Sequence, residues 1–437
     1  MLNSRIREHV QTSLQGIAKR AIESKKYRFL NLYQMINRIS LMDAWLDINK
    51  GAASGVDKVT AGEYEENLAE NIIDLEKRLK EKRYKAKLVR RVYIPKSKTK
   101  LRPLGIPALE DKLVQMAAAK ILGAIFEQDF LSCSWAYRPE IRVIDAVKDI
   151  TKSLMTGKFG YIVDADITGF FDNINHDWMV KMLELRINDN AFIRLIKKWL
   201  KAGILDDNKV THPDKGTPQG GLVSPVLSNI YLHYVLDLWF TKVIKPQCEG
   251  QAYICRYADD FVCAFQYKRE AKMFFEELNR RLKKFGLELS KEKTWMISFS
   301  RFRKEEQTSF IFLGIEFRWG ESRKGKDIIK RKTSKKKFQQ KLRDFTGWIK
   351  KNRNKRITWI FERLNMKLRG HYNYYGIIGN MKRLLDYFNG VIRLLFKWLN
   401  RRSQRRSYNY KGFRELCKHF KVLKPRIVEK PVSAFAK

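Results

Sequence analysis

The chain alternates between stretches with a helical spacing of hydrophobic residues and stretches with a strand-like spacing. Apolar residues recur at intervals of three and four from Gln11 to about Ile48, which predicts helix. Turn-forming residues follow at 49–57, and Ala61 to Lys82 has the pattern of a charged amphipathic helix. Leu109 to Phe126 is also expected to be helical. The first third of the chain is therefore predicted to be largely helical.

Strands are predicted where β-branched and aromatic residues alternate or run together between turn signals. Residues 252–256 and 261–265 enclose only four residues, so they are expected to form a hairpin. The other segments expected to be extended are 90–95, 101–106, 161–167 and 310–317. These patterns indicate at least one antiparallel sheet.

Helices return in the second half of the chain. Asn229 to Val243 and Lys268 to Phe285 have helical patterns, and from Lys330 onward the whole chain is predicted to be helical. Helices mixed with antiparallel strands indicate an α/β fold of the α+β type. With 437 residues, the chain exceeds the usual size of one domain, so two or three packed units are expected.

The net charge points to a polyanionic partner. The chain has 89 Lys and Arg against 47 Asp and Glu, a net charge of +42 that a nucleic acid would compensate. Residues 321–437 contain 35 basic and 7 acidic residues, which gives this segment +28. Basic and aromatic residues alternate there, as in Lys397-Trp398-Leu399-Asn400-Arg401-Arg402, and a merely solvated surface does not explain this pattern. The candidate nucleic-acid-binding residues are Arg401, Arg402, Arg405 and Arg406.

Cysteine usage and hydropathy favour an intracellular protein. The five cysteines include no Cys-x-x-Cys pair, so they are expected to be reduced thiols rather than zinc ligands. The N-terminus lacks the apolar stretch of a signal peptide, and no run of 18 apolar residues occurs. We therefore expect a cytoplasmic location and no membrane partner.

Adjacent carboxylates occupy the tip of the predicted hairpin, in Tyr257-Ala258-Asp259-Asp260. An isolated Asp-Asp pair would be ordinary turn chemistry, but Asp166 ends another apolar strand earlier in the chain. If the two strands are neighbours in one antiparallel sheet, three carboxylates converge at one end. Such a group is suited to two Mg²⁺ ions, or Mn²⁺ as a substitute, in phosphoryl transfer. No Gly-x-x-x-x-Gly-Lys-Ser/Thr motif occurs, which argues against a motor NTPase.

Seven short blocks surround these carboxylates in a characteristic order. Asp166-Ile167-Thr168-Gly169-Phe170-Phe171-Asp172-Asn173-Ile174, Gly216-Thr217-Pro218-Gln219-Gly220-Gly221-Leu222-Val223-Ser224-Pro225 and Tyr257-Ala258-Asp259-Asp260 resemble motifs A, B and C of reverse transcriptases. Ile94-Pro95-Lys96 with Arg102-Pro103-Leu104-Gly105-Ile106-Pro107 looks like the fingers motifs, Gly286-Leu287-Glu288-Leu289-Ser290-Lys291-Glu292-Lys293-Thr294 like motif D, and Phe312-Leu313-Gly314-Ile315 like the primer-grip strand. Leu368-Arg369-Gly370-His371-Tyr372-Asn373-Tyr374-Tyr375-Gly376 and Trp398-Leu399-Asn400-Arg401-Arg402-Ser403 look like the thumb, or maturase-specific X domain, of group II intron proteins.

The resemblance implies a right-hand polymerase fold in three parts. Residues 1–80 would form an N-terminal helical extension with a template-side loop. Residues 81–320 would form the fingers and the palm with its antiparallel sheet, and residues 321–437 an all-helical thumb or X domain. The chain ends at Lys437 without the HNH endonuclease module of some bacterial relatives, so second-strand cleavage is expected to come from elsewhere or to be unnecessary.

The resemblance also implies roles for individual residues. Asp166, Asp259 and Asp260 would be the catalytic carboxylates and metal ligands, with the Ile167 carbonyl as a backbone ligand. The residues expected to bind the dNTP are Lys96 and Arg102 at the triphosphate, Phe171 against the ribose 2′-hydroxyl, and Gln219 beside the nascent base pair. The alternatives are a solvated basic turn for Lys96 and Arg102, and a core position for Phe171. Asp164 and Asp172 are assigned to structure, and His176, His212 and His371 to packing or phosphate contacts.

The implied activity is that of an RNA-directed DNA polymerase, which extends a DNA primer on an RNA template with dNTPs. A second implied activity is binding of the structured parent intron RNA to assist splicing and mobility into a target DNA. The protein would act as a monomer or homodimer within a ribonucleoprotein, in a bacterium or an organelle. Two alternatives stay open: a domesticated reverse transcriptase in phage defence, DNA repair or CRISPR spacer acquisition, and a splicing maturase without polymerase activity.

Overall fold

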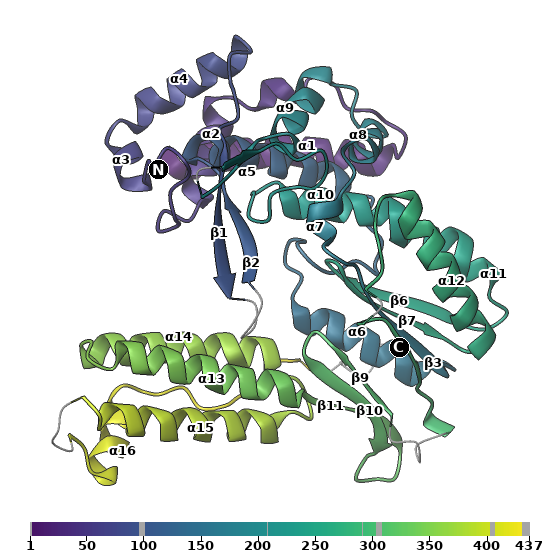
Figure 1. Cartoon of the computed structure of the whole chain (residues 1–437), viewed down its shortest axis with the longest axis vertical. Helices are drawn as coiled ribbons and strands as arrows, with labels where there is room; N and C mark the ends of the chain where they lie inside the picture. The colour runs from purple at the N-terminus through teal and green to yellow at the C-terminus, as the bar shows by residue number, and fades with distance from the viewer. Residues whose placement is uncertain are drawn as a thin grey trace. The chain divides into compact units, whose positions relative to one another are not determined.

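The chain forms two compact units, and neither is continuous in sequence. The structure is a computed structural model that describes residues 2–95, 101–207, 209–290, 292–302, 308–402 and 407–430. Unit 1 comprises Met1–Ile141, Ala165–Glu249 and Lys272–Thr294, and unit 2 comprises Arg142–Asp164, Gly250–Ala271 and Trp295–Lys437. Figure 1 shows the elements of both units in chain order of colour. In the described part of the chain, no helix has the length and apolar character needed to cross a membrane.

The N-terminal helical region of unit 1 consists of two helices rather than one. Helix α1 (Leu2–Glu23) and helix α2 (Arg38–Asp47) are separated by a connection that holds only the short 3-10 helix η1 (Tyr33–Met35). The prediction of helix from Gln11 to Ile48 is therefore wrong at 24–37. The apolar residues there anchor the connection instead, since Phe29 pairs with Ile187 in an isolated β-bridge. Asn37 then caps α2 by accepting from the backbone of Ile39 and Ser40.

Helix α5 (Leu109–Phe126) is the central helix of unit 1 and has the bounds that its sequence predicts. Both α1 and α2 pack against it, and its buried side chains include Leu113, Val114 and Ile121. The predicted helix at 229–243 is also present, although it includes two π-helical segments. The remaining helices of unit 1 are α3 (Ala61–Glu66), α4 (Leu68–Lys80), α7 (Phe170–Asn173), α8 (His176–Glu184), α9 (Asn190–Leu200), α10 (Ser224–Leu232), η2 (His233–Asp237), η3 (Phe240–Ile244), α11 (Lys245–Gln247) and most of α12 (Lys268–Lys284).

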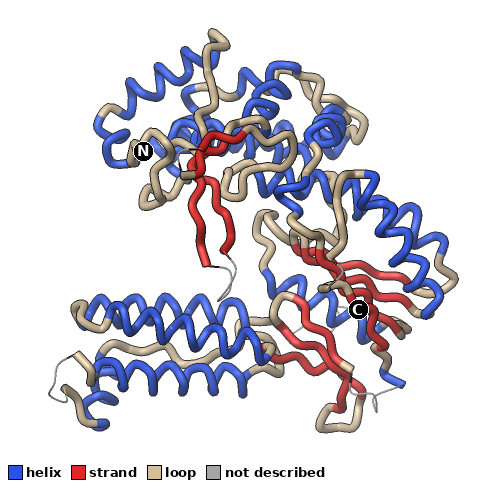
Figure 2. Tube along the Cα trace, in the orientation of Figure 1, coloured by secondary structure: helices blue, strands red, loops and turns tan. Residues whose placement is uncertain are grey.

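The sheet of unit 1 has the strand order β2-β1-β4-β5. Strands β1 (Val89–Pro95) and β2 (Leu101–Ile106) are antiparallel, and Figure 2 shows them as a long two-stranded ribbon. Val89 at the start of β1 pairs in parallel with Ile204 of β4 (Ile204–Asp206), which in turn pairs with β5 (Lys209–Thr211). The ribbon is therefore joined to the rest of unit 1 only through its base within this sheet.

A second sheet, with the order β6-β7-β3-β8, contains the predicted hairpin. Strands β6 (Ala252–Tyr257) and β7 (Asp260–Phe265) pair antiparallel, as expected from the sequence. Strand β3 (Tyr161–Asp166) lies next to β7 and pairs antiparallel with β8 (Trp295–Ser298). Helix α6 (Val143–Thr156) packs against β6.

The third sheet corrects the prediction of helix from Lys330 onward. Strands β9 (Ser309–Phe312), β10 (Ile315–Glu321) and β11 (Asp327–Thr333) form an antiparallel sheet in the order β11-β10-β9. In β11 the side chains of Ile329, Arg331 and Thr333 are buried alternately, which is the period of a strand. Basic residues between these positions hid that period in the sequence. Helix begins only after Ser334, whose side chain caps the next helix.

The C-terminal part of unit 2 is helical. Helices α13 (Lys335–Asn352), α14 (Ile357–Tyr375) and α15 (Met381–Leu399) lie side by side in Figure 1, and α16 (Tyr410–His419) follows. A buried ion pair ties this part to its sheet, because Arg331 donates from both terminal nitrogens to Glu429 at 2.9 Å each. The Glu429 carboxylate also accepts from the backbone of Ile378 at 2.6 Å. Residues that follow the last helix thus complete the core of this unit.

Candidate functional site

The backbone around Asp166 is held by the segment that resembles motif D. In strand β3 the side chains of Ile162, Val163 and Ala165 are buried, and Asp166 follows at the strand end. The Asp166 carbonyl accepts from Ser290 N at 2.8 Å, and Thr168 N donates to Glu288 O at 2.8 Å. Ile167 lies between these two bonds and forms a β-bridge with Leu289. Asp166 and the Ile167 carbonyl therefore occupy a firmly fixed stretch of backbone.

The Asp166 carboxylate has a cationic partner from the same segment. Lys293 Nζ contacts Asp166 Oδ2, and the Lys293 side chain is 61% exposed while that of Asp166 is 21% exposed. Because the ammonium is accessible to water, a competing cation can displace it at small cost. Lys293 was not singled out from the sequence as a partner of Asp166, and only the match to motif D placed it near the site.

A tight turn between β6 and β7 presents Asp259 and Asp260. Tyr257 pairs with Asp260, so the turn consists of Ala258 and Asp259, and Ala258 has a left-handed backbone with φ of +59°. Asp259 is half-buried and Asp260 is exposed. The fully buried Arg256 donates from Nη1 to the Ala258 carbonyl at 3.1 Å. Arg256 therefore helps to fix this turn, a role that the sequence indicates only through the oddity of an arginine within an apolar strand.

Strands β3 and β7 are neighbours, which is the arrangement that the carboxylate hypothesis required. The candidate ligands are the carboxylates of Asp166, Asp259 and Asp260 and the Ile167 carbonyl, all of them hard oxygen donors of the kind that Mg²⁺ prefers. Among the residues that the structure describes, no three His, Cys, Asp or Glu side chains are grouped closely enough to hold a metal ion. Convergence of the three carboxylates stays a prediction.

Gln219 and Asp172 lie together at the base of the β1–β2 ribbon. A small cavity of about 10 Å³ is lined by both residues and by Arg91, with Gly105 of β2 beside them. Gln219 Nε2 donates to Asp172 Oδ2 at 3.4 Å, and Gly105 N donates to Gln219 O at 2.6 Å. Burial raises the pKa of Asp172, and the nearby Arg91 opposes this shift.

Close backbone approach explains the glycine that follows Gln219. Gly220 has φ of +122°, and a Cβ there would lie 2.4 Å from the Gly105 carbonyl oxygen. Only glycine allows the loop to lie against β2 in this way. The sequence placed Gln219 in a glycine-flanked loop correctly. It did not indicate that Asp172 and Arg91 would line the same cavity.

Phe171 is half-buried, next to the fully buried Phe170. The two rings meet edge to face with centroids 5.3 Å apart. The Phe171 carbonyl accepts from Thr217 N at 2.7 Å, so the segments that resemble motifs A and B are joined here by a backbone hydrogen bond. A half-buried ring is compatible with both the predicted contact to a sugar and the core alternative.

The candidate triphosphate ligands are on the β1–β2 ribbon. Arg102 is exposed on β2 and pairs with Ile94 of β1. Lys96 lies outside the described residues, so its predicted role is without a structural account. The exposure of Arg102 is compatible with both a contact to the triphosphate and the alternative of a solvated basic turn.

The basic cluster at the C-terminal helices contains two different arginines. The Arg401 side chain is exposed, with its guanidinium 5.6 Å from the centre of the Trp398 ring. The Arg402 guanidinium instead donates to the carbonyls of Arg353 and Lys355, just after the end of α13. Arg402 thus stabilises a helix end, where a positive charge is favourable. Arg405 and Arg406 lie outside the described residues.

Several cations surround the Trp398 ring. Lys350, Arg353 and Lys397 also lie within 5.4 to 5.9 Å of its centre. Nearby, the rings of Trp348 and Trp359 stack with centroids 6.3 Å apart. A surface that combines aromatic rings with guanidinium and ammonium groups is suited to nucleic-acid backbones and bases.

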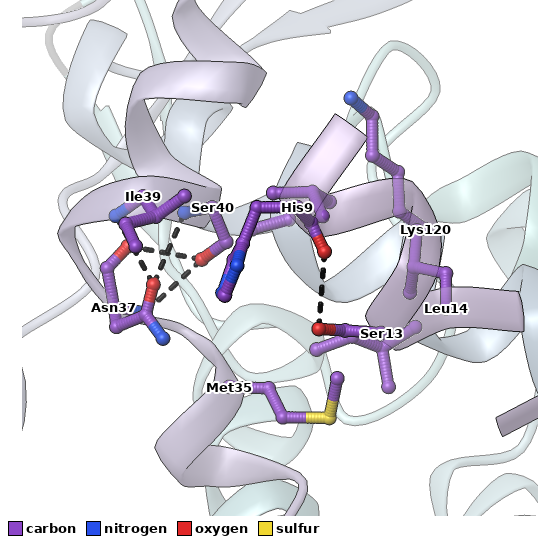
Figure 3. Close-up of a pocket in the computed structure, with 11 residues that line it drawn as sticks. His9, Ser13, Leu14, Met35, Asn37, Ile39, Ser40 and Lys120 are labelled. Atoms are coloured by element: carbon purple, nitrogen blue, oxygen red, sulfur yellow. Dashed lines mark hydrogen bonds between the residues drawn. The ribbon is translucent and has the colours of Figure 1, made fainter. Parts of the chain in front are cut away.

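A larger cavity, of about 70 Å³, lies among α1, α2 and α5 and contains none of the predicted site residues (Figure 3). Its lining is mixed, with Leu14, Met35 and Ile39 beside polar groups. In Figure 3, Ser13 Oγ donates to the His9 carbonyl at 3.1 Å, which satisfies the hydroxyl within α1. This cavity belongs to the packing of the N-terminal helices and is separate from the candidate chemistry.

Comparison with known proteins identifies two family matches along the chain. Residues 94–317 match the reverse transcriptase (RNA-dependent DNA polymerase) family, and residues 335–416 match the group II intron maturase-specific domain. The group II intron-encoded protein LtrA of Lactococcus lactis subsp. cremoris is 30% identical over 464 aligned residues, covering 86% of this chain and 75% of LtrA. Protein YkfC of Escherichia coli K12 is 33% identical over 311 residues, covering 63% of this chain and 80% of YkfC.

A solved structure of telomerase from Candida albicans, in complex with a TWJ fragment of telomeric RNA, also matches. Its TM-score is 0.45 at 13% identity, and the match covers 78% of this chain and 64% of that chain. The family matches and LtrA span the motifs around Asp166, Asp259 and Asp260 as well as the helices of unit 2. The chain therefore belongs to the reverse transcriptase family, as a group II intron-encoded reverse transcriptase with a maturase-specific domain.

Proposed function

We propose that the protein extends a DNA primer on an RNA template and that Asp166, Asp259 and Asp260 are the carboxylates at which the reaction occurs. The observation that carries this proposal is the sheet order, in which the strand ending at Asp166 adjoins the strand that follows the Asp259 turn. Membership of the reverse transcriptase family supports the same reaction. Residues 1–80, 81–320 and 321–437 would be the N-terminal extension, the fingers and palm, and the thumb.

The residues present fit a divalent metal by the chemistry of their donors. Asp166 already contacts one cation, the Lys293 ammonium, and the other candidate ligands are carboxylate or carbonyl oxygens. Asp166, Asp259, Asp260 and the Ile167 carbonyl would hold two Mg²⁺ ions, and Mn²⁺ accepts the same donors. When bound, such ions lower the pKa of an attacking hydroxyl and neutralise charge on the triphosphate.

The protein's own side chains would position the substrates. Lys96 and Arg102 would bind the triphosphate of the incoming dNTP through charge-assisted hydrogen bonds. Gln219, held at the base of the ribbon by Gly105, would line the nascent base pair. Phe171 would lie beneath the sugar and exclude a ribose 2′-hydroxyl by contact.

The second part of the proposal is that residues 321–437 bind the structured RNA of the parent intron and assist its splicing and mobility. The charge of +28 in this segment and the cations around Trp398 support it. The match to the maturase-specific domain and the similarity to LtrA point to the same RNA class. The protein would shape and anchor this RNA through phosphate contacts, which are independent of the carboxylates.

A double substitution tests the catalytic assignment. Asp259→Ala with Asp260→Ala should abolish Mg²⁺-dependent primer extension on RNA while intron RNA affinity stays within about twofold, since phosphate contacts dominate that affinity. The matched control is Glu276→Ala with Glu277→Ala on α12, which removes the same charge from an adjacent acidic pair. Extension that survives in the first variant, or is lost equally in the control, would reject these carboxylates as the catalytic ones.

A further inference from the structure

The two-residue turn between β9 and β10 has an unusual backbone. Phe312 pairs with Ile315, which leaves Leu313 and Gly314 as the turn, with φ of +53° and +75°. Two left-handed residues match the twist of a hairpin, but a leucine in that region is uncommon and strained. Such a turn keeps its conformation only if its surroundings hold it.

The surroundings that hold this turn come from the helices of unit 2. Tyr374 of α14 donates from Oη to the Leu313 carbonyl at 3.2 Å. Ser334, which caps α13, donates from its backbone N to the Gly314 carbonyl at 3.0 Å. Both carbonyl groups of the turn are therefore engaged by residues at the helices.

Space on the other side of the turn is also filled by these helices. A Cβ added to Gly314 would lie 3.0 Å from Lys337 Cγ and 3.2 Å from Tyr375 Oη. The turn thus sits in a fitted seat between the start of α13 and the end of α14. Any movement of α14 would be transmitted directly to Leu313 and Gly314.

Tyr374 also lies close to the turn that bears Asp260. Burial, the neighbouring Tyr375, Tyr257 and the charge of Asp260 all raise the pKa of the Tyr374 hydroxyl. Coulombic effects of this kind require proximity, and the strand β9 that leads into Leu313 packs against β7. Tyr257, Asp260, Leu313 and Tyr374 all belong to unit 2.

The end of α14 is itself fixed, so Tyr374 is presented from a rigid position. Asn380 is 1% exposed, and its Nδ2 donates to the Tyr375 carbonyl at 2.8 Å and to Thr333 Oγ1 at 2.9 Å. Its Oδ1 accepts from Thr333 N at 2.9 Å. Thr333 pairs with Ile315, the residue directly after the turn. Helix end, strand and turn therefore form one hydrogen-bonded assembly.

We propose that Tyr374 is a positioning residue, which holds the Leu313–Gly314 turn beside the Asp259–Asp260 turn and so sets where the primer 3′ end lies relative to the carboxylates. The inference rests on the proposed polymerase function. It assigns to a thumb tyrosine a role in primer placement, and none in binding the incoming nucleotide. Loss of its hydroxyl should therefore act on the primer–template and not on the dNTP.

Tyr374→Phe tests this role because it removes one hydroxyl and keeps the ring. We expect the KM for primer–template to rise, and the number of nucleotides added per binding event to fall, by roughly two- to tenfold, the range for one lost hydrogen bond. The KM for dNTP should stay within about twofold, since the dNTP contacts are on other elements. Both values are measured on the full-length protein with a DNA primer annealed to RNA.

The same helix provides a matched control. Tyr372 donates from its hydroxyl to the Leu423 carbonyl at 3.1 Å, away from the turn, so Tyr372→Phe removes an equivalent hydrogen bond. This variant should keep the wild-type KM for primer–template. Equal effects of the two variants, or wild-type primer use by Tyr374→Phe, would overturn the positioning role. Absence of primer extension by the wild-type protein would instead reject the proposed function.

Discussion

Lys293 and Asp166 form an ion pair at the end of β3, in which an exposed ammonium faces a largely buried carboxylate. The pair joins the segment that resembles motif D to the segment that resembles motif A. Its ammonium occupies one side of a proposed metal ligand. A divalent cation that binds Asp166 must therefore compete with Lys293.

Lys293→Gln should strengthen Mg²⁺ binding, because it removes the competing ammonium and keeps much of the length of the side chain. The gain should be less than about fivefold, as exposed ion pairs are weak. Calorimetric titration of the protein with Mg²⁺, without substrates, measures this directly. Lys284→Gln on α12 controls for the loss of one positive charge. Weaker Mg²⁺ binding by Lys293→Gln alone would contradict competition.

Phe171→Ala should admit ribonucleotides if the ring lies beneath the sugar. We expect the preference for dNTP over rNTP to fall on the order of tenfold, which is typical when a steric exclusion is relieved. The measurement is kcat/KM for each nucleotide on the same primer–template. If the ring is only core, the variant will lose thermal stability while its preference for dNTP stays as in the wild type.

Arg401 and Arg402 should respond differently to replacement by Gln. Arg401→Gln should flatten the dependence of log RNA affinity on log salt by about 0.7 to 0.9 for each phosphate that the guanidinium neutralises, with little change in stability. Arg402→Gln should instead lower the free energy of unfolding by about 1 kcal/mol, because two carbonyl groups lose their donor. Urea unfolding and RNA titration at several salt concentrations separate the two effects. Identical behaviour of the variants would contradict this division.

His371 should make the stability of unit 2 depend on pH. Its ring stacks on Tyr387 at 3.7 Å, and burial, aided by Lys341, lowers its pKa to about 3. The folded state therefore resists protonation, whereas the unfolded chain takes up a proton below about pH 6.5. Stability from this residue is present above pH 6.5 and is lost as the pH falls toward 3, by up to about 1.4 kcal/mol per pH unit.

His371→Phe keeps an aromatic ring at this position and removes the titrating group. The difference in unfolding free energy between wild type and variant should shrink or reverse as the pH is lowered from 7.5 to 4.5. Urea unfolding at several pH values gives this difference, in which contributions from other residues cancel. A difference that is constant over the range would show that His371 is not the group responsible.

Local patterns predicted the hairpin at 252–265 and helix α5 from the sequence alone. In both, the feature that matters is local: a short gap between two apolar runs, or an uninterrupted helical period. The same local signals placed Asp259 at a turn and Asp166 at a strand end. The prediction failed at residues 24–37 and 330–333, where apolar or basic residues are used for contacts with distant strands.

The supporting residues could not be found in the same way. Arg256, Arg402 and Tyr374 all act on backbone carbonyl groups, and a carbonyl acceptor leaves no trace in the amino-acid sequence. Asp172 was assigned to structure from its position alone, yet it lines a cavity with Gln219. Motif matching identifies residues that contact substrate in relatives, whereas residues that hold the backbone in place depend on the tertiary fold.

The buried pair between Arg331 and Glu429 has a consequence for how the protein is made. Translation yields Arg331 almost a hundred codons before its carboxylate partner, and until then its guanidinium has no counter-charge from Glu429. A buried charge deprived of its partner costs about 3 to 5 kcal/mol, so the segment beginning at Trp295 cannot close properly on the ribosome before residue 429 has emerged. Messages cut short within the last helices would yield chains whose RNA-binding helices are present but unanchored, and such products are targets for proteolysis.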